Sequence, residues 1–273
     1  MRPMHTTPMS TPLPSFGHAL RQWRGQRRLT QLDLSLQAGV SARHLSFVET
    51  GRASPSREMV LRLAHCLSVP MRERNAWLVA AGFAPMYRER SLDDPALADA
   101  MRSVQRLLDA QSPFPAMAMD RHWNVVASNV ATQRVLSGGS PSLLASPNVM
   151  RLCHHPEGLA PRIANLSQVR ENHALRLAQQ LQASHDPVLA DMLEELRRYP
   201  LPAARQTQRM DGEHTGIVAP FQLESDEGLL SFFTTSAVFG SVADITLSEL
   251  AVESFLPADE ATAQAVRRIV LED

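Results

Sequence analysis

The sequence predicts two domains of different class: an all-α domain of five short helices, followed by an α+β domain whose largely antiparallel sheet has helices inserted between its strands. The length of 273 residues exceeds the commonest range of a single domain. The apolar spacing is helical from residue 16 to about residue 84 and becomes mixed beyond Pro95. The charge changes as well. Residues 1–90 hold 13 Arg and 5 acids, a net +8, whereas residues 91–273 hold 14 Arg and 23 acids, a net −9.

The charge and the composition exclude some classes of protein and favour others. All 27 cationic side chains are Arg, and a basic first third joined to an acidic remainder suggests that one part is built for a polyanion. No apolar stretch approaches the roughly 18–20 residues that cross a bilayer, so we expect no membrane protein. Residues 1–14 are rich in Pro, Thr, Ser and Met, which predicts a disordered leader rather than a signal peptide. Cys66 and Cys153 can build neither a disulfide framework nor a thiolate metal site, which favours a reducing cytoplasm.

The first domain is expected over residues 15–84. Apolar residues at i, i+4 and i+7 place Phe16, Leu20 and Trp23 on one face of a first helix. Thr30 and Ser41 are residue types that cap helices, and the glycine between them tolerates a positive φ after a helix. The expected helices are one beginning at Phe16, one over 31–38, one over 42–50, a fourth that starts at Pro55-Ser56 and buries Val60, Leu63, Ala64 and Leu67, and a fifth from Pro70 to Gly82.

A linker or connecting helix is expected over 85–110, and the second domain over 111–270. Aromatic and β-branched residues, as in the run 232–235, are typical of strands, and Asp-Gly and Asp-Glu-Gly sequences supply hairpin turns. Strands at both ends with helices between them are typical of an α+β domain. We predict helices over 96–110, 129–136, 148–154, 164–183 and 187–198, and strands over 116–119, 123–127, 205–210, 216–224, 229–239 and 245–255.

Residues 24–67 carry a motif that matches a known pattern in order and spacing. The motif reads Arg24-x-x-Arg27-x-Leu29-Thr30-Gln31-x-Asp33-Leu34, then Ala38-Gly39-Val40-Ser41, Leu45-Ser46, Glu49-x-Gly51-Arg52-x-Ser54-Pro55-Ser56 and Leu63-Ala64-x-x-Leu67. It resembles the helix-turn-helix domain of the XRE/Cro repressor-like family, which has the lambda repressor-like fold and binds DNA. One departure is Ser35, where a small Ala is usual in a packed corner. The resemblance implies that Arg24 and Glu49 form an ion pair that holds the first helix against the third and reads no bases.

The third helix can be assigned to DNA from its own residues. If Leu45 and Val48 are buried, the residues in the first turn of this helix face outward. A recognition helix contacts the major groove with exposed residues of this kind. Arg43 can pair with guanine O6 and N7, the alternative being a solvated surface residue. Phe47 either contacts a thymine methyl or is partly buried against the second helix. The predicted DNA-binding residues are Gln31, Ser41, Ala42, Arg43, His44, Ser46, Phe47 and Arg52, of which Gln31, Ser41 and Arg52 are expected to contact phosphates.

Four segments of the second domain carry a second resemblance. They are residues 119–129, 148–159, 231–235 and 255–260, the first of which reads Met-Asp-Arg-x-Trp-Asn-Val-Val-Ala-Ser-Asn. Together with the first domain they look like the MmyB-like transcription regulators, over almost the whole chain. The resemblance implies a PAS-like domain with a buried pocket for a small apolar ligand, fatty acids being the leading candidates. The expected lining is Met117, Met119, Trp123, Val125, Phe232 and Phe233, residue types that are also typical of a packed sheet core.

The histidines of the second domain could suggest a metal site or a catalyst. Adjacent histidines on a helix point about 100° apart, so His154 and His155 are a poor chelating pair. No zinc, phosphate-loop or hydrolase motif accompanies them. We therefore expect helix-end and loop histidines with satisfied hydrogen bonds, no metal, no catalytic residue, and no cofactor other than a bound fatty acid or similar apolar molecule.

These observations predict a cytoplasmic, DNA-binding transcription regulator that binds double-stranded DNA as a homodimer and responds to a small-molecule effector. Two alternatives stay open. In the first, the protein is a repressor whose second domain only dimerises and binds no ligand. In the second, an enzyme acting on a small acyl substrate is fused to a DNA-binding domain, which would need a convergent set of His, Ser or carboxylate side chains.

Overall fold

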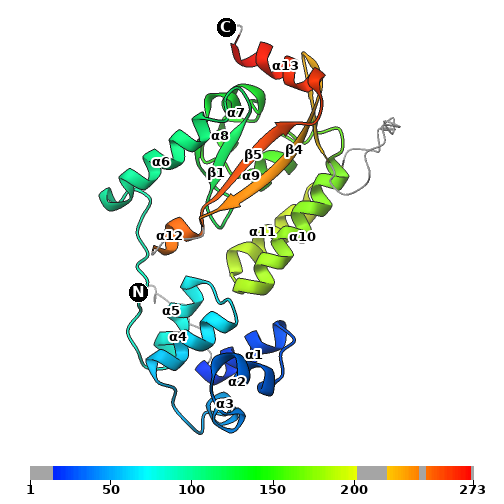
Figure 1. The fold of residues 1–273 in the computed structure, drawn as a ribbon. Helices are drawn as coiled ribbons and strands as arrows, with labels where there is room; N and C mark the ends of the chain where they lie inside the picture. The colour runs from blue at the N-terminus through cyan, green and yellow to red at the C-terminus, as the bar shows by residue number, and fades with distance from the viewer. Residues whose placement is uncertain (1–14, 202–219, 240–243, 272–273) are drawn as a thin grey trace, which may run out of the picture. The chain divides into compact units, whose positions relative to one another are not determined.

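The structure, a computed structural model, describes residues 15–201, 220–239 and 244–271. Their contacts divide the chain into two units (Figure 1). The first unit extends to Glu89 and includes Asp244 and Ile245, and the second unit holds the remainder. The predicted leader over 1–14 and the predicted strand over 205–210 lie outside the described residues. Within the described ranges, no helix combines the length and the apolar character that crossing a membrane requires.

The first unit has the five predicted helices, each beginning close to its predicted start. The residues that precede the first four are Ser or Thr, and each of their hydroxyls accepts a hydrogen bond from a backbone N–H of the first turn. The inward faces share one core, in which Trp77 packs edge-on against Phe16 and Trp23, with ring centroids 5.4 and 6.4 Å apart. The helices are α1 (Phe16–Gln26), α2 (Gln31–Ala38), α3 (Ala42–Glu49), α4 (Arg57–Cys66) and α5 (Met71–Ala80).

A glycine in α1 allows this helix to lie directly on the end of α3. A Cβ atom on Gly17 would lie 2.6 Å from the carbonyl oxygen of Val48 and 2.7 Å from that of Glu49. Both distances are far below van der Waals contact, so any larger residue would push the two helices apart. The close approach fixes the last turn of α3 within the unit.

The second unit is built on an antiparallel sheet with the strand order β2-β1-β5-β4-β3. Figure 1 labels its strands β1, β5 and β4. The strand that comes last in the sequence lies in the middle, between β1 and β4. The strands are β1 (Ala116–Met119), β2 (Val125–Ser128), β3 (Phe221–Ser225), β4 (Gly228–Val238) and β5 (Ala251–Pro257), and the helices of this part of the chain are the 3-10 helix η1 (Pro95–Leu97), α6 (Ala98–Asp109), α7 (Val130–Val135), α8 (Pro141–Ala145), α9 (Val149–His154), α10 (Leu166–Ser184), α11 (Pro187–Arg198), α12 (Ile245–Ser248) and α13 (Glu260–Leu271).

Helices cover both faces of this sheet. On one face, which we call the outer face, Val104 and Leu108 of α6 pack against Ala116, Ala118 and Val252. The opposite, inner face carries the larger core, to which α7, α9, α10, α11 and α13 contribute. Because side chains alternate along a strand, β1 gives its alanines to the outer face and its methionines to the inner one. The described residues confirm the predicted fold class.

Several elements differ from the prediction. Residues 245–248, predicted as the start of a strand, form α12, and β5 begins only at Ala251, because the period of two does not hold through this stretch. The helices α8 and α13 were not predicted. For α13 the sequence does carry a signal, since Asp259 accepts a hydrogen bond from the backbone N–H of Thr262 (2.7 Å), and Ala263, Val266 and Val270 recur on one buried face.

Candidate functional site

A tight turn joins α2 to α3. Thr30 and Asp33 form a reciprocal capping box at the start of α2. Gly39 then ends this helix at φ 62°, in the left-handed region that glycine tolerates best. Two residues later, the Ser41 hydroxyl accepts a hydrogen bond from the backbone N–H of His44 at 3.2 Å and starts α3. The local sequence thus sets the reversal between the two helices.

One buried carboxylate holds three helices of this unit together. Arg24 of α1 donates from Nε and Nη2 to Glu49 of α3, at 2.7 and 3.0 Å. Gln31 of α2 donates to the same carboxylate at 2.8 Å, and a third nitrogen of Arg24 donates to the carbonyl of Leu29. Burial opposes ionisation of Glu49, but the hydrogen bonds from Arg24 and Gln31 outweigh it and hold its pKa below the usual value. The ion pair that the resemblance implied is present.

The outward side of α3 has a cationic side chain near its start. Leu45 and Val48 lie in the core, whereas the Arg43 side chain is exposed, with its guanidinium carbon 5.4 Å from the centroid of the Phe47 ring. Within the described part of the chain neither Arg43 nor Arg52 forms an ion pair. The remaining predicted contacts divide into the exposed Ser41, His44 and Arg52 and the half-buried Gln31, Ala42, Ser46 and Phe47.

Gln31 has a structural partner within the unit, and its predicted phosphate contact stays a prediction. Its side-chain amide donates to Glu49 and thereby positions α2 against α3. The side chain has one further N–H, but its orientation is set by the buried carboxylate. The prediction from its place at a helix start missed this, because no sequence pattern within α2 reveals a partner 18 residues away.

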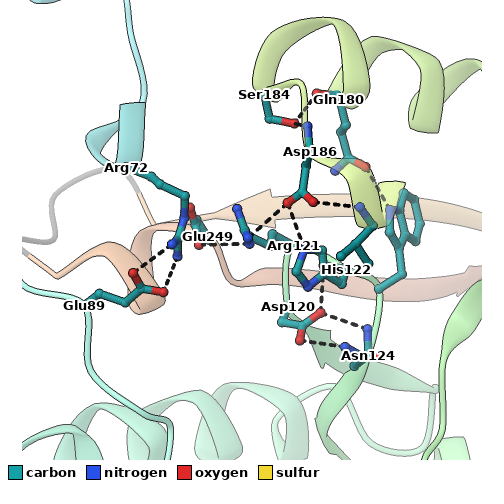
Figure 2. A network of polar contacts seen from close by, with 12 residues as sticks. Arg72, Glu89, Asp120, Arg121, His122, Asn124, Gln180, Ser184, Asp186 and Glu249 are labelled. Atoms are coloured by element: carbon teal, nitrogen blue, oxygen red, sulfur yellow. Dashed lines mark hydrogen bonds and ion pairs between the residues drawn. The ribbon is translucent and has the colours of Figure 1, made fainter. Parts of the chain in front are cut away.

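In the second unit, the Asp-Arg-x-Trp-Asn part of the motif builds a turn (Figure 2). Asp120 accepts hydrogen bonds from the backbone N–H groups of His122 and Asn124, at 2.8 and 2.9 Å, and from the Asn124 side chain at 2.9 Å. This turn holds Trp123 at φ 65°. The predicted strand over 123–127 is therefore wrong at its start, and β2 begins at Val125.

The same turn is tied to the loop between α10 and α11 (Figure 2). Asp186 caps α11 through the backbone N–H of Val188, at 2.9 Å. Its carboxylate also contacts the His122 ring at 2.9 Å and the Arg121 guanidinium at 3.0 Å. Burial opposes ionisation of Asp186, but these hydrogen bonds and the charge of Arg121 outweigh it and hold its pKa below normal. This part of the motif therefore organises the fold and leaves the ring of Trp123 facing inward.

A polar cluster begins at that ring. The indole nitrogen of Trp123 donates to Gln180 of α10 at 2.8 Å, and the guanidinium carbon of Arg176 lies 4.4 Å from the indole centroid. Arg176 also reaches Glu253 on the inner face at 3.4 Å and the Ser236 hydroxyl at 3.2 Å. Burial raises the pKa of Glu253, and the single contact with Arg176 compensates only partly.

Two histidines extend this cluster into the core. His154 Nε2 lies 2.8 Å from His173 Nδ1, and His154 is 0% exposed. Burial lowers the pKa of both rings, with further lowering by Arg170 at His154 and by His154 and Arg176 at His173. The expectation of satisfied histidines is wrong at His154, whose Nδ1 has no hydrogen-bond partner among the described residues. In the same ranges, no group of three or more His, Cys, Asp or Glu side chains could hold a metal ion.

Both units match known families. Residues 15–77 match a helix-turn-helix domain, and residues 100–269, more than half of the chain, match the MmyB-like transcription regulator ligand binding domain. This chain belongs to the MmyB-like transcription regulators. It is a DNA-binding transcription regulator with a ligand-binding domain, as the sequence predicted. No curated protein matches it.

The predicted pocket residues of this MmyB-like regulator lie mostly in the inner core. Met117, Met119, Trp123 and Phe232 are buried there, and Val125 packs against them. Phe233 is half-buried and points to the outer face, because it alternates with Phe232 along β4. That any of these residues contacts a ligand stays a prediction.

Sequence reasoning missed the polar side of the ligand-binding domain. Arg170, His173, Arg176 and Gln180 follow one another on α10 at spacings of three, three and four residues, which places them along one face of the helix. The signal that could have found them is His173, which stands within an apolar stripe that includes Val169 and Leu177.

Proposed function

We propose that the regulator binds operator DNA as a homodimer, with α3 of each copy in the major groove and Arg43 reading a guanine. The observation that carries this proposal is the exposed Arg43, which forms no ion pair with any described residue, on the first turn of a helix whose far end is fixed by Glu49. A planar guanidinium can donate two parallel hydrogen bonds to guanine O6 and N7. Phe47, beneath this guanidinium, limits the directions in which it can point.

Charge and symmetry support the same proposal. The net charge of +8 over residues 1–90 favours a polyanion. A single domain of this size makes few phosphate contacts, whereas two copies on half-sites about 34 Å apart reach useful affinity. With ~8 phosphates neutralised per dimer, the affinity should fall with the logarithm of the salt concentration at a slope near −7. Binding that is insensitive to salt would contradict the proposal.

A matched pair of variants tests the assignment of Arg43. In binding assays against a set of operator base variants, Arg43→Ala should lose about 1–3 kcal/mol of discrimination at the base that it contacts. Arg52→Ala removes the same charge from the turn after α3 and should weaken binding to all sequences alike. Equal base preferences in the wild type and in Arg43→Ala would refute the role of Arg43.

We also propose that the ligand-binding domain senses a small, fatty-acid-like molecule in the cytoplasm and that the protein has no catalytic role. The methionine and phenylalanine side chains of the inner core support an apolar ligand. The runner-up is a repressor whose second domain dimerises and binds no ligand. Mass spectrometry of the denatured, purified protein separates the two, since a co-purified lipid is expected only for a sensor.

A further inference from the structure

Two buried side-chain nitrogens in the ligand-binding domain have no hydrogen-bond partner among the described residues: His154 Nδ1 and Arg170 Nε. They come from neighbouring helices, α9 and α10, and the charge of Arg170 acts on His154. The other two guanidinium nitrogens of Arg170 are occupied, because they donate to the carbonyls of Tyr199 and Pro200 at 2.7 and 2.9 Å. A buried polar atom without a partner costs free energy, so native proteins usually supply one from the protein, an ordered water, an ion or a ligand.

The hydrogen-bond roles within the histidine pair bear on the kind of atom that His154 Nδ1 can bind. A neutral imidazole has one ring hydrogen, and burial keeps both rings neutral near pH 7. When His173 Nδ1 donates to His154 Nε2, the hydrogen of His154 is on Nδ1, which becomes a donor. Arg170 Nε is a donor in every state. Each of these two donors, on neighbouring helices, then calls for an acceptor, and one carboxylate has two oxygens to offer.

We propose that the acceptor is the carboxylate end of the effector, bound by His154 Nδ1 and Arg170 Nε, with the apolar remainder of the effector along the inner core. This inference rests on the proposed ligand-sensing function. The surrounding charges favour an anion: Arg170 and Arg176 are cationic, and the carboxylate of the cluster, Glu253, is already in contact with Arg176. A cationic ligand would face Arg170 without a counter-ion. An alcohol of the same length would keep the apolar contacts and lose the charge-assisted hydrogen bonds.

The test compares decanoic acid with 1-decanol on the full chain, by isothermal titration. The wild type should bind the acid about 10-fold to 100-fold more tightly, the size of one charge-assisted hydrogen bond. In the double variant His154→Phe/His173→Phe this preference should fall to less than about threefold, with the affinity for decanol unchanged. Replacing both partners of a buried polar pair by apolar rings of similar shape is nearly neutral for folding. His155→Gln, the same kind of change on the next residue, should retain the preference.

A second measurement on the wild type does not depend on the folding of a variant. In the ¹⁵N spectrum of the histidine side chains, decanoate should shift the Nδ1 signal of His154, and decanol should leave it in place. Equal affinity for acid and alcohol, a preference that survives the double substitution, or a His154 signal that stays unmoved would each overturn the inference but leave the sensor function intact. Binding of neither probe would contradict the proposed apolar effector and this inference together.

Discussion

Glu49 in the helix-turn-helix unit and Glu253 in the ligand-binding unit are both buried carboxylates that face an arginine, yet their pKa values shift in opposite directions. Glu49 accepts two hydrogen bonds from Arg24 and a third from Gln31, all within 3.0 Å. Glu253 has one contact at 3.4 Å with Arg176, which also lies over an indole ring and reaches a serine. Burial raises the pKa of both carboxylates, and only at Glu49 do the hydrogen bonds outweigh it.

The difference distinguishes a complete buried network from an incomplete one. A fully satisfied buried network rigidifies the fold, and in the first unit it fixes the end of the helix that presents Arg43. Among the residues that the structure describes, the cluster of the second unit is incomplete, with a weakly held Glu253 and a nitrogen of His154 that has no hydrogen-bond partner. An incomplete network costs stability, and a ligand that completes it binds with the corresponding gain.

The largest expected effect is on the satisfied network. Glu49→Ala leaves the guanidinium of Arg24 without its partner and should lower the free energy of unfolding of the first unit by about 3 kcal/mol. Thermal unfolding followed by circular dichroism measures this loss. Glu58→Ala is the control, because Glu58 forms an exposed pair with Arg62, so the change should be within about 0.5 kcal/mol. Similar effects of the two substitutions would remove the distinction between the units.

The dependence on pH should have opposite signs at the two carboxylates. The pKa of Glu49 is lowered by folding, so its contribution is present above the ordinary glutamate value of 4.5 and is lost as the pH falls through the folded-state value. The pKa of Glu253 is raised, so its contribution is present below 4.5 and is lost as the pH rises through the folded-state value.

Two isosteric variants test the sign of the pH dependence of stability at each carboxylate. Near pH 7, Glu253→Gln should be about 1 kcal/mol more stable than the wild type and Glu49→Gln less stable, and both differences should shrink toward about pH 4. Urea unfolding at the two pH values checks the result. Destabilisation by Glu253→Gln near neutral pH would show that Glu253 is as well compensated as Glu49.

The smallest effect is expected at Ser35, a polar residue satisfied within its own helix. Its hydroxyl is buried and donates to the carbonyl of Leu32 at 2.8 Å. Ser35→Ala removes the hydroxyl that donates this hydrogen bond and leaves no buried donor without a partner. The free energy of unfolding should therefore change by less than about 0.5 kcal/mol. A larger loss in urea unfolding would show that the packed corner depends on this hydroxyl.

The elements predicted correctly are those whose pattern is local. Capping residues and a 3.6-residue period are enough to place α1 to α5, and α11 coincides with its prediction over 187–198. The errors arise where an unrecognised local turn or a distant strand partner decides. Asp120 turns Trp123 out of the expected strand, and β5 pairs with β1 across more than 130 residues of sequence.

The candidate sites also divide into one that local sequence patterns reveal and one that they do not. The outward residues of α3 could be assigned from helical periodicity, since burial of Leu45 and Val48 leaves Arg43 on the surface. In the second unit, sequence reasoning found the apolar core but not its polar cluster. His154 and Glu253 meet α10 only through the tertiary fold, and no motif connects them along the chain.

Methylation interference tests the central claim, that Arg43 reads guanine in the major groove. Dimethyl sulfate methylates guanine N7, the atom that one guanidinium N–H would contact. Operator fragments selected by the wild type should lose binding when one particular guanine in each half-site is methylated, and that guanine should cease to matter in Arg43→Ala. An identical interference pattern for the two proteins, or binding unaffected by any guanine methylation, would contradict the claim.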